Sequence, residues 1–219
     1  MLIKDFMTKE IPVLKKGDTV SYVLQLMDEF KVRHLPMVDN GMFECLIDEK
    51  SLLSRSDVNE VIGSTVISSP SVDPVTHILD ALSYFTRFKV TVLPVVSKDK
   101  SYLGSITRNS LVDALSETLG SEQPGSIIVL EIRPTDYSLT DIARIVEGNN
   151  AHVLTLISTI APDTGLIHVS LKIDLEDASP VIRSFERFNY TILFHFMNHG
   201  VVFDILQQRV DELIHYINM

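Results

Sequence analysis

The chain has 219 residues, of which 45% are hydrophobic, and a formal net charge of −10, so it is long enough to fold as two domains. Its single Cys excludes an internal disulfide, and no uncharged apolar run approaches the ~20 residues that span a bilayer, so we expect a cytoplasmic protein with no membrane partner. Residues 121–219 carry 6 basic and 13 acidic residues, an acidity that disfavours nucleic acid as a partner.

An eight-residue peptide occurs twice in the first half of the chain. Residues 31–38 read KVRHLPMV and residues 89–96 read KVTVLPVV, 58 positions later. Upstream of each copy, behind the expected N-cap residues Asp18 and Thr76, apolar side chains recur with the spacing of an amphipathic helix. These two stripes are Val20, Val23, Leu24 and Met27, and Ile78, Ala81, Leu82 and Phe85. Such self-similarity predicts a duplicated structural unit.

Each copy is predicted to run helix, strand, turn, strand, helix. Apolar runs predict strands at 33–38 and 44–47 in the first copy, and at 91–96 and 102–107 in the second. Asn40 and Gly41 tolerate positive φ and predict a tight hairpin turn between the first two strands. The sequence therefore predicts an α/β fold in which one small unit appears twice.

Four segments of this half resemble CBS domains. They are residues 31–39 (KVRHLPMVD), the opening at 3–8 (IKDFMT), the segment 68–73 (SSPSVD) and the strand 104–107 (GSIT). Two copies, at 1–60 and 61–120, resemble the tandem CBS pair, or Bateman module, with pseudo-twofold symmetry. This resemblance implies a regulatory role and a cleft that binds AMP, ADP, ATP or a related adenosyl ligand, with no cofactor required and no enzymatic activity.

The resemblance also indicates which residues bind the ligand. In the family motif a strand ends with Thr or Ser, and an Asp three residues later holds the ribose hydroxyls. The second copy has Thr107 but Ser110 at the Asp position, and the first has Asp48 at the Thr position and Ser51 at the Asp position. Because Ser110 is a neutral acceptor, we expect modest affinity, and we expect the Asp48 side to bind more weakly than the Thr107 side.

The remaining parts of the expected nucleotide cleft follow from the same resemblance. The base is expected against Val92, Leu93 and Pro94 of the repeated peptide. Arg108 or Arg33 is the expected phosphate partner, because a guanidinium group matches phosphate oxygens in pairs. For any single Arg, a solvated position at the rim is the common alternative.

After a polar linker at 120–126 (GSEQPGS), the second half of the chain has a different pattern of apolar residues. Strands are predicted at 127–132, 152–160, 166–173 and 191–196, and helices at 139–146 and 177–188. The resulting order, β-α-β-β-α-β, is the ferredoxin-like pattern. A last amphipathic helix is predicted at 200–217, with Val202, Ile205, Leu206, Val210, Leu213 and Ile217 on one side, so this domain is expected to span 125–219.

This order, with residues 142–146 (IARIV) followed by 148–153 (GNNAHV), resembles an ACT domain. The family carries Pro-Gly in the loop after the first strand, where this chain has Asp136 and Tyr137, and Tyr lacks the conformational freedom of Gly. An ACT-like fold kept only for dimerisation is therefore as well supported as an amino-acid sensor. A CBS pair followed by an ACT-like domain resembles the acetoin-utilisation (AcuB-type) proteins.

Enzymatic function finds little support in the sequence. Cys45 could serve as a nucleophile, but it lies in a predicted apolar strand where the second copy has Gly104, so a small buried side chain is the better interpretation. His195 and His199 have i, i+4 spacing, but their surroundings predict strand and turn, so we expect no metal site.

Two classes of function remain. The first is a ligand-sensing module that controls an unidentified partner protein. The second is a structural or interaction protein whose CBS and ACT sites bind no ligand and serve dimerisation. In both cases an exposed sheet edge and apolar helix faces predict a symmetric homodimer.

Overall fold

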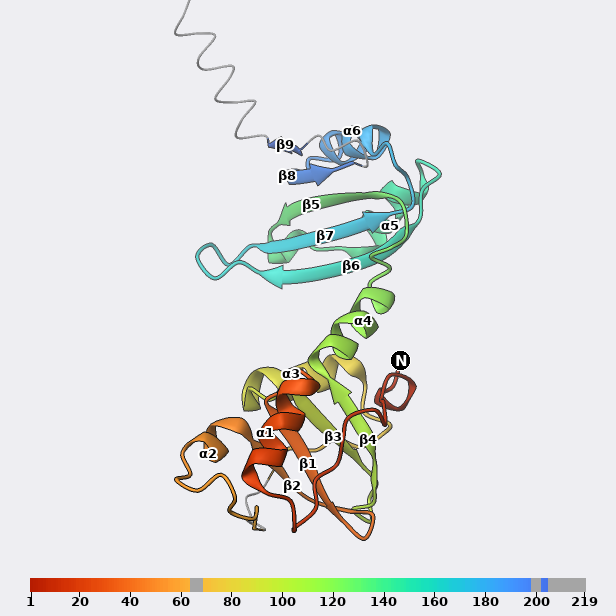
Figure 1. The fold of residues 1–219 in the computed structure, drawn as a ribbon. Coiled ribbons are helices and arrows are strands. Elements are labelled where there is room, and N and C mark those ends of the chain that lie inside the picture. Colours follow the sequence, from red (N-terminus) through yellow and green to blue (C-terminus); the bar gives the residue numbers. More distant parts are fainter. Residues whose placement is uncertain (64–68, 198–201, 205–219) are drawn as a thin grey trace, which may run out of the picture. The chain divides into compact units, whose positions relative to one another are not determined.

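The computed structural model describes residues 1–63, 69–197 and 202–204 (Figure 1). The chain divides into two compact units, Met1–Thr118 and Leu119–Met219, which we call unit 1 and unit 2. Both mix helices with antiparallel sheet, and the fold is the predicted α/β class.

Unit 1 contains the duplicated structure. After a 3-10 turn at Ile3–Asp5, the first repeat consists of α1 (Val20–Glu29), β1 (His34–Asp39), β2 (Met42–Asp48) and α2 (Glu49–Leu53). The second repeat consists of α3 (Ile78–Phe88), β3 (Val92–Val96), β4 (Tyr102–Thr107) and α4 (Arg108–Thr118). The predicted order of helix, strand, turn, strand and helix is therefore present in both copies.

The two hairpins of unit 1 share even their irregularities. The register of β1 and β2 shifts between Met37 and Val38, and the register of β3 and β4 shifts between Val95 and Val96. These positions are equivalent in the repeated peptide. Asn40 and Gly41 both have positive φ, as the predicted hairpin turn requires.

The two long helices of the repeats start one residue later than expected. Thr19 caps α1 by accepting the Tyr22 N–H through its hydroxyl, and His77 caps α3 through its ring nitrogen. Asp18, the expected cap of α1, instead accepts the Lys15 N–H at 2.7 Å. A short polar side chain can bond either to the turn before it or to the helix after it, which explains the one-residue error.

Each repeat has its own core, and each core also contacts a side chain from the other repeat. The predicted stripes are buried at Val20, Val23 and Met27 in the first repeat and at Ile78, Ala81 and Phe85 in the second. Val92 of the second repeat belongs to the core of the first, and Leu46 of the first packs against the core of the second. The two repeats are thus one interlocked unit.

Unit 2 has the predicted β-α-β-β-α-β order. Its elements are β5 (Ser126–Ile132), a 3-10 turn (Pro134–Asp136), α5 (Leu139–Glu147), β6 (Val153–Ile160), β7 (Ile167–Ile173), α6 (Ser179–Arg187), β8 (Thr191–Phe196) and β9 (Val202–Asp204). The strands are arranged in the order β6-β7-β5-β8-β9, and every neighbouring pair is antiparallel. Without β9, this arrangement is the ferredoxin-like sheet.

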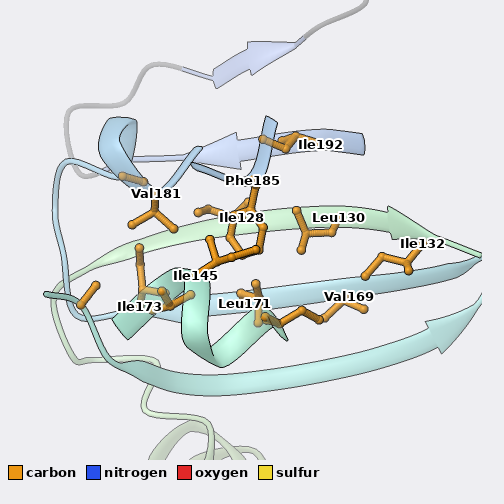
Figure 2. Packing of buried hydrophobic residues seen from close by; sticks show 14 residues of the cluster. Ile128, Leu130, Ile132, Ile145, Val169, Leu171, Ile173, Val181, Phe185 and Ile192 are labelled. Atoms are coloured by element: carbon orange, nitrogen blue, oxygen red, sulfur yellow. The ribbon is translucent and has the colours of Figure 1, made fainter. Parts of the chain in front are cut away.

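One face of this sheet carries the core of unit 2, shown in Figure 2. Alternate residues of β5 and β7 point toward helices α5 and α6, where Ile145, Val181 and Phe185 meet them. The side chains of β5 and β7 in this layer are Ile128, Leu130, Ile132, Val169, Leu171 and Ile173. Both helices therefore lie on the same face, as split βαβ units require.

The prediction of a C-terminal helix at 200–217 is wrong for residues 202–204. These residues form β9, which pairs with β8 from Phe196↔Val202 to Phe194↔Asp204. An edge strand offers unpaired N–H and C=O groups, and the sequence Val-Phe suits a strand. The rest of the predicted helix, and the predicted turn at 198–200, lie outside the described residues.

Candidate functional site

A pocket of about 480 Å³ lies in unit 1 where the ends of β1 and β2 meet the second repeat. We call it the Asp48 pocket. It is lined by Arg33, His34, Leu46, Asp48, Glu49, Lys50, Ser69, Pro70, Phe88, Lys89 and Val90. Of the residues expected at the Thr107 side, only Arg33 belongs to this wall, which also contains Asp48, the residue expected at the weaker site.

Asp48 stands at the mouth of this pocket because it ends β2 and begins α2. One carboxylate oxygen accepts the Ser51 N–H at 3.3 Å, and the Ser51 hydroxyl donates to the Asp48 carbonyl at 2.6 Å. This is an N-cap, in which a carboxylate satisfies an orphan amide of the first turn. The Asp48 side chain remains 44% exposed, so it keeps acceptor capacity for a ligand.

His34 joins the two repeats beside Asp48. Its Nδ1 accepts the Thr91 backbone N–H at 3.2 Å, and its Nε2 lies 3.5 Å from an Asp48 carboxylate oxygen. Because Nδ1 accepts, the ring proton of the neutral form sits on Nε2 and faces Asp48. The Thr91 hydroxyl in turn accepts the Arg33 N–H at 2.9 Å. His34 is thereby fixed in one orientation from both sides.

The charge state of His34 follows from its surroundings. Burial lowers the pKa of His34 below its usual value, and the nearby Asp48 carboxylate opposes that shift. The cations Arg108 and Arg33 lower the pKa further, while Glu49 raises it. At neutral pH the ring is therefore an uncharged hydrogen-bonding wall of the pocket.

Basic side chains surround the rim of the Asp48 pocket. Arg33 pairs loosely with Glu49, at 3.8 Å between nitrogen and oxygen. Lys50 and Lys89 also line the pocket, and no carboxylate of the described residues lies within ion-pair distance of either ammonium group. Lys89 has a left-handed backbone, with φ of 53°, where it ends α3. Two unneutralised cations make this rim attractive to an anion.

The expected Thr107 site is present as a polar cluster at the start of α4. The Thr107 N–H donates to the Ser110 hydroxyl at 2.9 Å, and the Ser110 N–H donates to the Thr107 hydroxyl at 3.0 Å. This reciprocal pair has the form of a capping box. Each hydroxyl is therefore already occupied by one backbone amide and keeps only part of its capacity for a ligand.

The expected base-binding strand lies beside this cluster. Val92 pairs with Thr107, and Pro94 pairs with Ser105. Val92, Leu93 and Pro94 are all buried, so their side chains offer a base almost no surface and the expected stacking against them has no exposed face to use. The Arg108 side chain is exposed, while its N–H donates to the Thr91 carbonyl at 3.1 Å. Arg33 and Arg108 thus contact the same residue through their backbones, from the two repeats.

The residues that sequence reasoning missed are His34, Thr91 and Lys89. A signal for two of them was available, because the repeated peptide differs between its copies at Arg33 and Thr91 and at the next position, His34 and Val92. Polar divergence inside an otherwise repeated strand marks the junction between the repeats.

Other expectations about chemistry can be compared directly with the structure. Cys45 is buried, and burial raises the pKa of its thiol, which suits a structural role. Within residues 1–63, 69–197 and 202–204, no three His, Cys, Asp or Glu side chains are grouped as metal ligands. In the same ranges, every helix is too short or too polar to cross a membrane.

Comparison with known proteins supports the duplicated architecture. The CBS domain family model matches residues 3–57 and 58–117. A homoserine O-acetyltransferase of Methanohalobium evestigatum is 22% identical over 121 residues, which is 52% of this chain but only 24% of that protein.

Solved structures also resemble this chain. A CBS domain pair/ACT domain protein of Thermotoga maritima is 24% identical, over 53% of this chain and 98% of that one, with a TM-score of 0.49. An acetoin utilization protein (AcuB) of Vibrio cholerae is 26% identical, over 56% and 95%, with a TM-score of 0.48. A structure of CBSX2 in complex with AMP is 27% identical, over 53% of this chain and 96% of that one, with a TM-score of 0.47. From the two family matches, which together span more than half of its length, the chain belongs to the CBS domain family.

Proposed function

We propose that this protein is a regulatory ligand sensor that binds an adenine nucleotide or a related adenosyl ligand in its CBS pair and controls a partner protein. The observation that carries the proposal is the Asp48 pocket, which combines the carboxylates of Asp48 and Glu49, two unneutralised ammonium groups and an apolar wall. A nucleotide presents the complementary set: ribose hydroxyls, phosphates and a flat base.

Each part of the pocket suits one part of the ligand. Asp48 can accept hydrogen bonds from both ribose hydroxyls while it caps α2. Lys50 and Lys89 suit the phosphates, and Arg33 adds a guanidinium group. Phe88, which is 43% exposed, and Pro70 offer apolar surface for the base.

The Thr107 site is the second candidate for the same ligand. It keeps the ribose-facing hydroxyl of the family motif, and its two hydroxyls lie 3.0 Å apart at the start of α4. In this arrangement the base lies beside β3 at Val92, Leu93 and Pro94, whose side chains are buried, and Arg108 or Arg33 binds the phosphates. Each site predicts that a different substitution weakens binding, so one set of variants distinguishes the two sites.

Calorimetric titration of the full chain with AMP, ADP and ATP tests both sites. For the Asp48 pocket, Asp48→Asn keeps a good N-cap but removes the charge, and we expect about tenfold weaker binding, since a hydrogen bond to a charged group contributes about 1.5–3 kcal/mol. Lys89→Asn keeps a residue that tolerates positive φ. We expect this substitution to weaken the binding of ATP more than that of adenosine, which has no phosphates. If the Thr107 site binds instead, Thr107→Ala weakens and Ser110→Asp strengthens binding, with Asp48→Asn neutral.

The competing interpretation is a structural protein whose sites bind nothing. It requires that none of the three nucleotides, S-adenosylmethionine or NADH raises the melting temperature. A ligand at 100 times its dissociation constant, in contrast, adds about 2.7 kcal/mol to the free energy of unfolding.

We propose 1–60, 61–120 and 125–219 as the domain boundaries.

We also propose a symmetric homodimer, as exposed sheet edges favour pairing. Light scattering at micromolar concentration is expected to give twice the mass of the chain, and the mass of a single chain would contradict the dimer.

A further inference from the structure

Strand β6 forms one edge of the unit 2 sheet, next to β7 (Figure 1). Its eight residues, Val153–Ile160, include no charged residue, no Pro and no Gly. Sheet edges are usually protected from pairing by charges, by Pro or by bulges. The register shift of β6, between Val153 and Thr155, lies at the start of the strand. From Thr155 to Ile160, β6 is therefore a regular edge that another strand can join.

The backbone groups of β6 alternate between β7 and the open edge. Just after the strand, the Ala161 N–H donates to the Leu166 carbonyl at 2.9 Å, in the register of the β6–β7 pairs. Every second residue of an antiparallel pair bonds to the neighbouring strand, so the odd-numbered residues from Thr155 onward bond to β7. The residues that point their N–H and C=O groups to the open edge are Leu156, Ser158 and Ile160. Among the described residues, none hydrogen-bonds to these groups.

The side chains of β6 follow a symmetric pattern on the sheet face opposite the helices. Thr155, Ile157 and Thr159 lie on that face, because their partners on β7 alternate with the core residues Val169 and Leu171. The order Thr, Ile, Thr at alternate positions reads the same in both directions about Ile157. The Ile157 residue is 45% exposed, so it has apolar surface left to bury.

Pairing with a second copy of β6 satisfies the backbone and the side chains together. When two copies run antiparallel with Ile157 on the twofold axis, Leu156 of each copy lies opposite Ser158 of the other, and both have free backbone groups. Ile157 meets its own copy in a non-hydrogen-bonded pair, where side chains approach most closely, and Thr155 meets Thr159. Because β6 carries no charge, like charges do not oppose each other between the two strands.

We propose that two copies of this chain join at β6, antiparallel and centred on Ile157, so that their unit 2 sheets become one continuous sheet. This inference rests on the homodimer proposed above and identifies its interface. An unrelated extended peptide could also bond to the open edge, but the symmetric order of Thr and Ile matches β6 itself. Such self-complementarity is what a twofold interface requires.

The threonine pairs add hydrogen bonds to this interface. The Thr155 hydroxyl donates to the Leu119 carbonyl at 2.7 Å, so its oxygen remains an acceptor for the exposed Thr159 hydroxyl of the second copy. Each interface contains this pair twice, once on either side of Ile157. Cross-strand threonine pairs of this kind stabilise sheets.

Single-cysteine substitutions in the full chain test this register. In Ile157→Cys the two new thiols face each other across the axis, with Cα atoms about 4.5 Å apart, a separation that a disulfide spans. Under mild oxidation we expect a band of twice the chain mass that reductant removes. The native Cys45 is buried, so the wild-type chain measures the background.

Thr159→Cys is the matched control, because residue 159 is exposed on the same face of the same strand. In the proposed register its two copies lie four positions apart, roughly 14 Å along the strand, so it should remain reduced. Ser158→Cys tests the alternative in which Ser158 lies on the axis, and we expect less cross-linking from it than from Ile157→Cys. The reverse order, or equal cross-linking at 157 and 159, would overturn the proposed pairing.

A charge on the axis gives a second test. Ile157→Lys places two ammonium groups opposite each other, and we expect its mass in light scattering to fall to that of a single chain. Ile157→Val, which keeps a β-branched apolar side chain, should remain a dimer at the same concentration. Circular dichroism verifies that both variants are folded.

Light scattering of the wild-type chain separates this proposal from the homodimer on which it rests. A wild-type dimer combined with a dimeric Ile157→Lys variant would overturn the β6 interface and leave the homodimer standing. The same holds if Ile157→Cys reacts with maleimide but forms no cross-link. A wild-type mass equal to a single chain would overturn both.

Nucleotide titration is independent of these outcomes, because β6 lies in unit 2 and the Asp48 pocket lies in unit 1.

Discussion

The two repeats of unit 1 have the same backbone structure but different polar side chains at their junction. Their hairpins have the same register shift, and their long helices bury equivalent positions. At the junction, however, the first repeat has His34 and Asp48 where the second has Val92 and Thr107. The first set forms a polar wall beside a pocket, while Val92 is buried and Thr107 caps a helix.

This contrast shows how a duplicated fold acquires one specialised site. Apolar positions must keep filling a core, so they change between the copies only to other apolar side chains, as Met27 does to Phe85. Polar positions at the junction are free to diverge, because either a hydroxyl or a carboxylate can cap a helix. The following variants measure how far the repeats differ, in order of expected effect.

The matched core positions Met27 and Phe85 should give the largest loss. Met27 is 1% exposed and Phe85 is 2% exposed, in separate cores. We expect Phe85→Ala to cost about 3–5 kcal/mol of unfolding free energy and Met27→Ala about 2–5 kcal/mol. Denaturant unfolding measures both, with exposed Leu79→Ala as the control. A loss confined to one repeat would show that the cores are not equivalent.

Gly104, which corresponds to Cys45, should be the next most sensitive position. A Cβ at Gly104 would lie 2.8 Å from the Thr8 carbonyl oxygen, which accepts the Ser105 N–H. We expect Gly104→Ala to cost about 1–3 kcal/mol, as overpacking usually does. Gly17→Ala is the control, because its added methyl meets no atom within 4 Å. Thermal melts that show equal losses for the two variants would contradict the close approach.

The helix caps of the two repeats should differ modestly. Thr107 caps the 11-residue α4 at 3.0 Å, and Asp48 caps the five-residue α2 at 3.3 Å. We expect Thr107→Ala to cost about 1 kcal/mol and Asp48→Ala less, because the shorter helix contributes less. Thr107→Ser should restore stability in the same unfolding assay. A Ser variant as unstable as the Ala variant would show that the lost methyl, not the cap, matters.

The pH dependence of unit 1 should trace to the first repeat alone. Burial lowers the folded-state pKa of His34, so as pH falls below about 6.5 the unfolded chain takes up a proton first and stability decreases. Asp48 and Glu49 oppose this shift, while Arg33 and Arg108 reinforce it. Melting between pH 7.5 and 5 should therefore depend less on pH in His34→Gln than in wild type, and His77→Asn is the control. An unchanged slope in His34→Gln would assign the effect elsewhere.

Much of the fold could be predicted from the sequence because its signals are local. The stripes of α1 and α3 and the alternation along β5 and β7 are read within a single element. The β9 strand could not be predicted, since its sequence also fits a helical stripe and only pairing with β8 decides its conformation. The sequence indicated Asp48 as part of a ligand site, but the other walls of the Asp48 pocket could not be predicted, because Ser69 and Lys89 meet Asp48 only through the fold.

The exchange of side chains between the two cores has an evolutionary meaning. Because Val92 completes the first core and Leu46 packs on the second, neither repeat buries its apolar surface alone. A single ancestral repeat would have needed a second copy of itself to fold. Gene duplication and fusion would then have converted that partner into a covalent neighbour and freed each half to mutate separately.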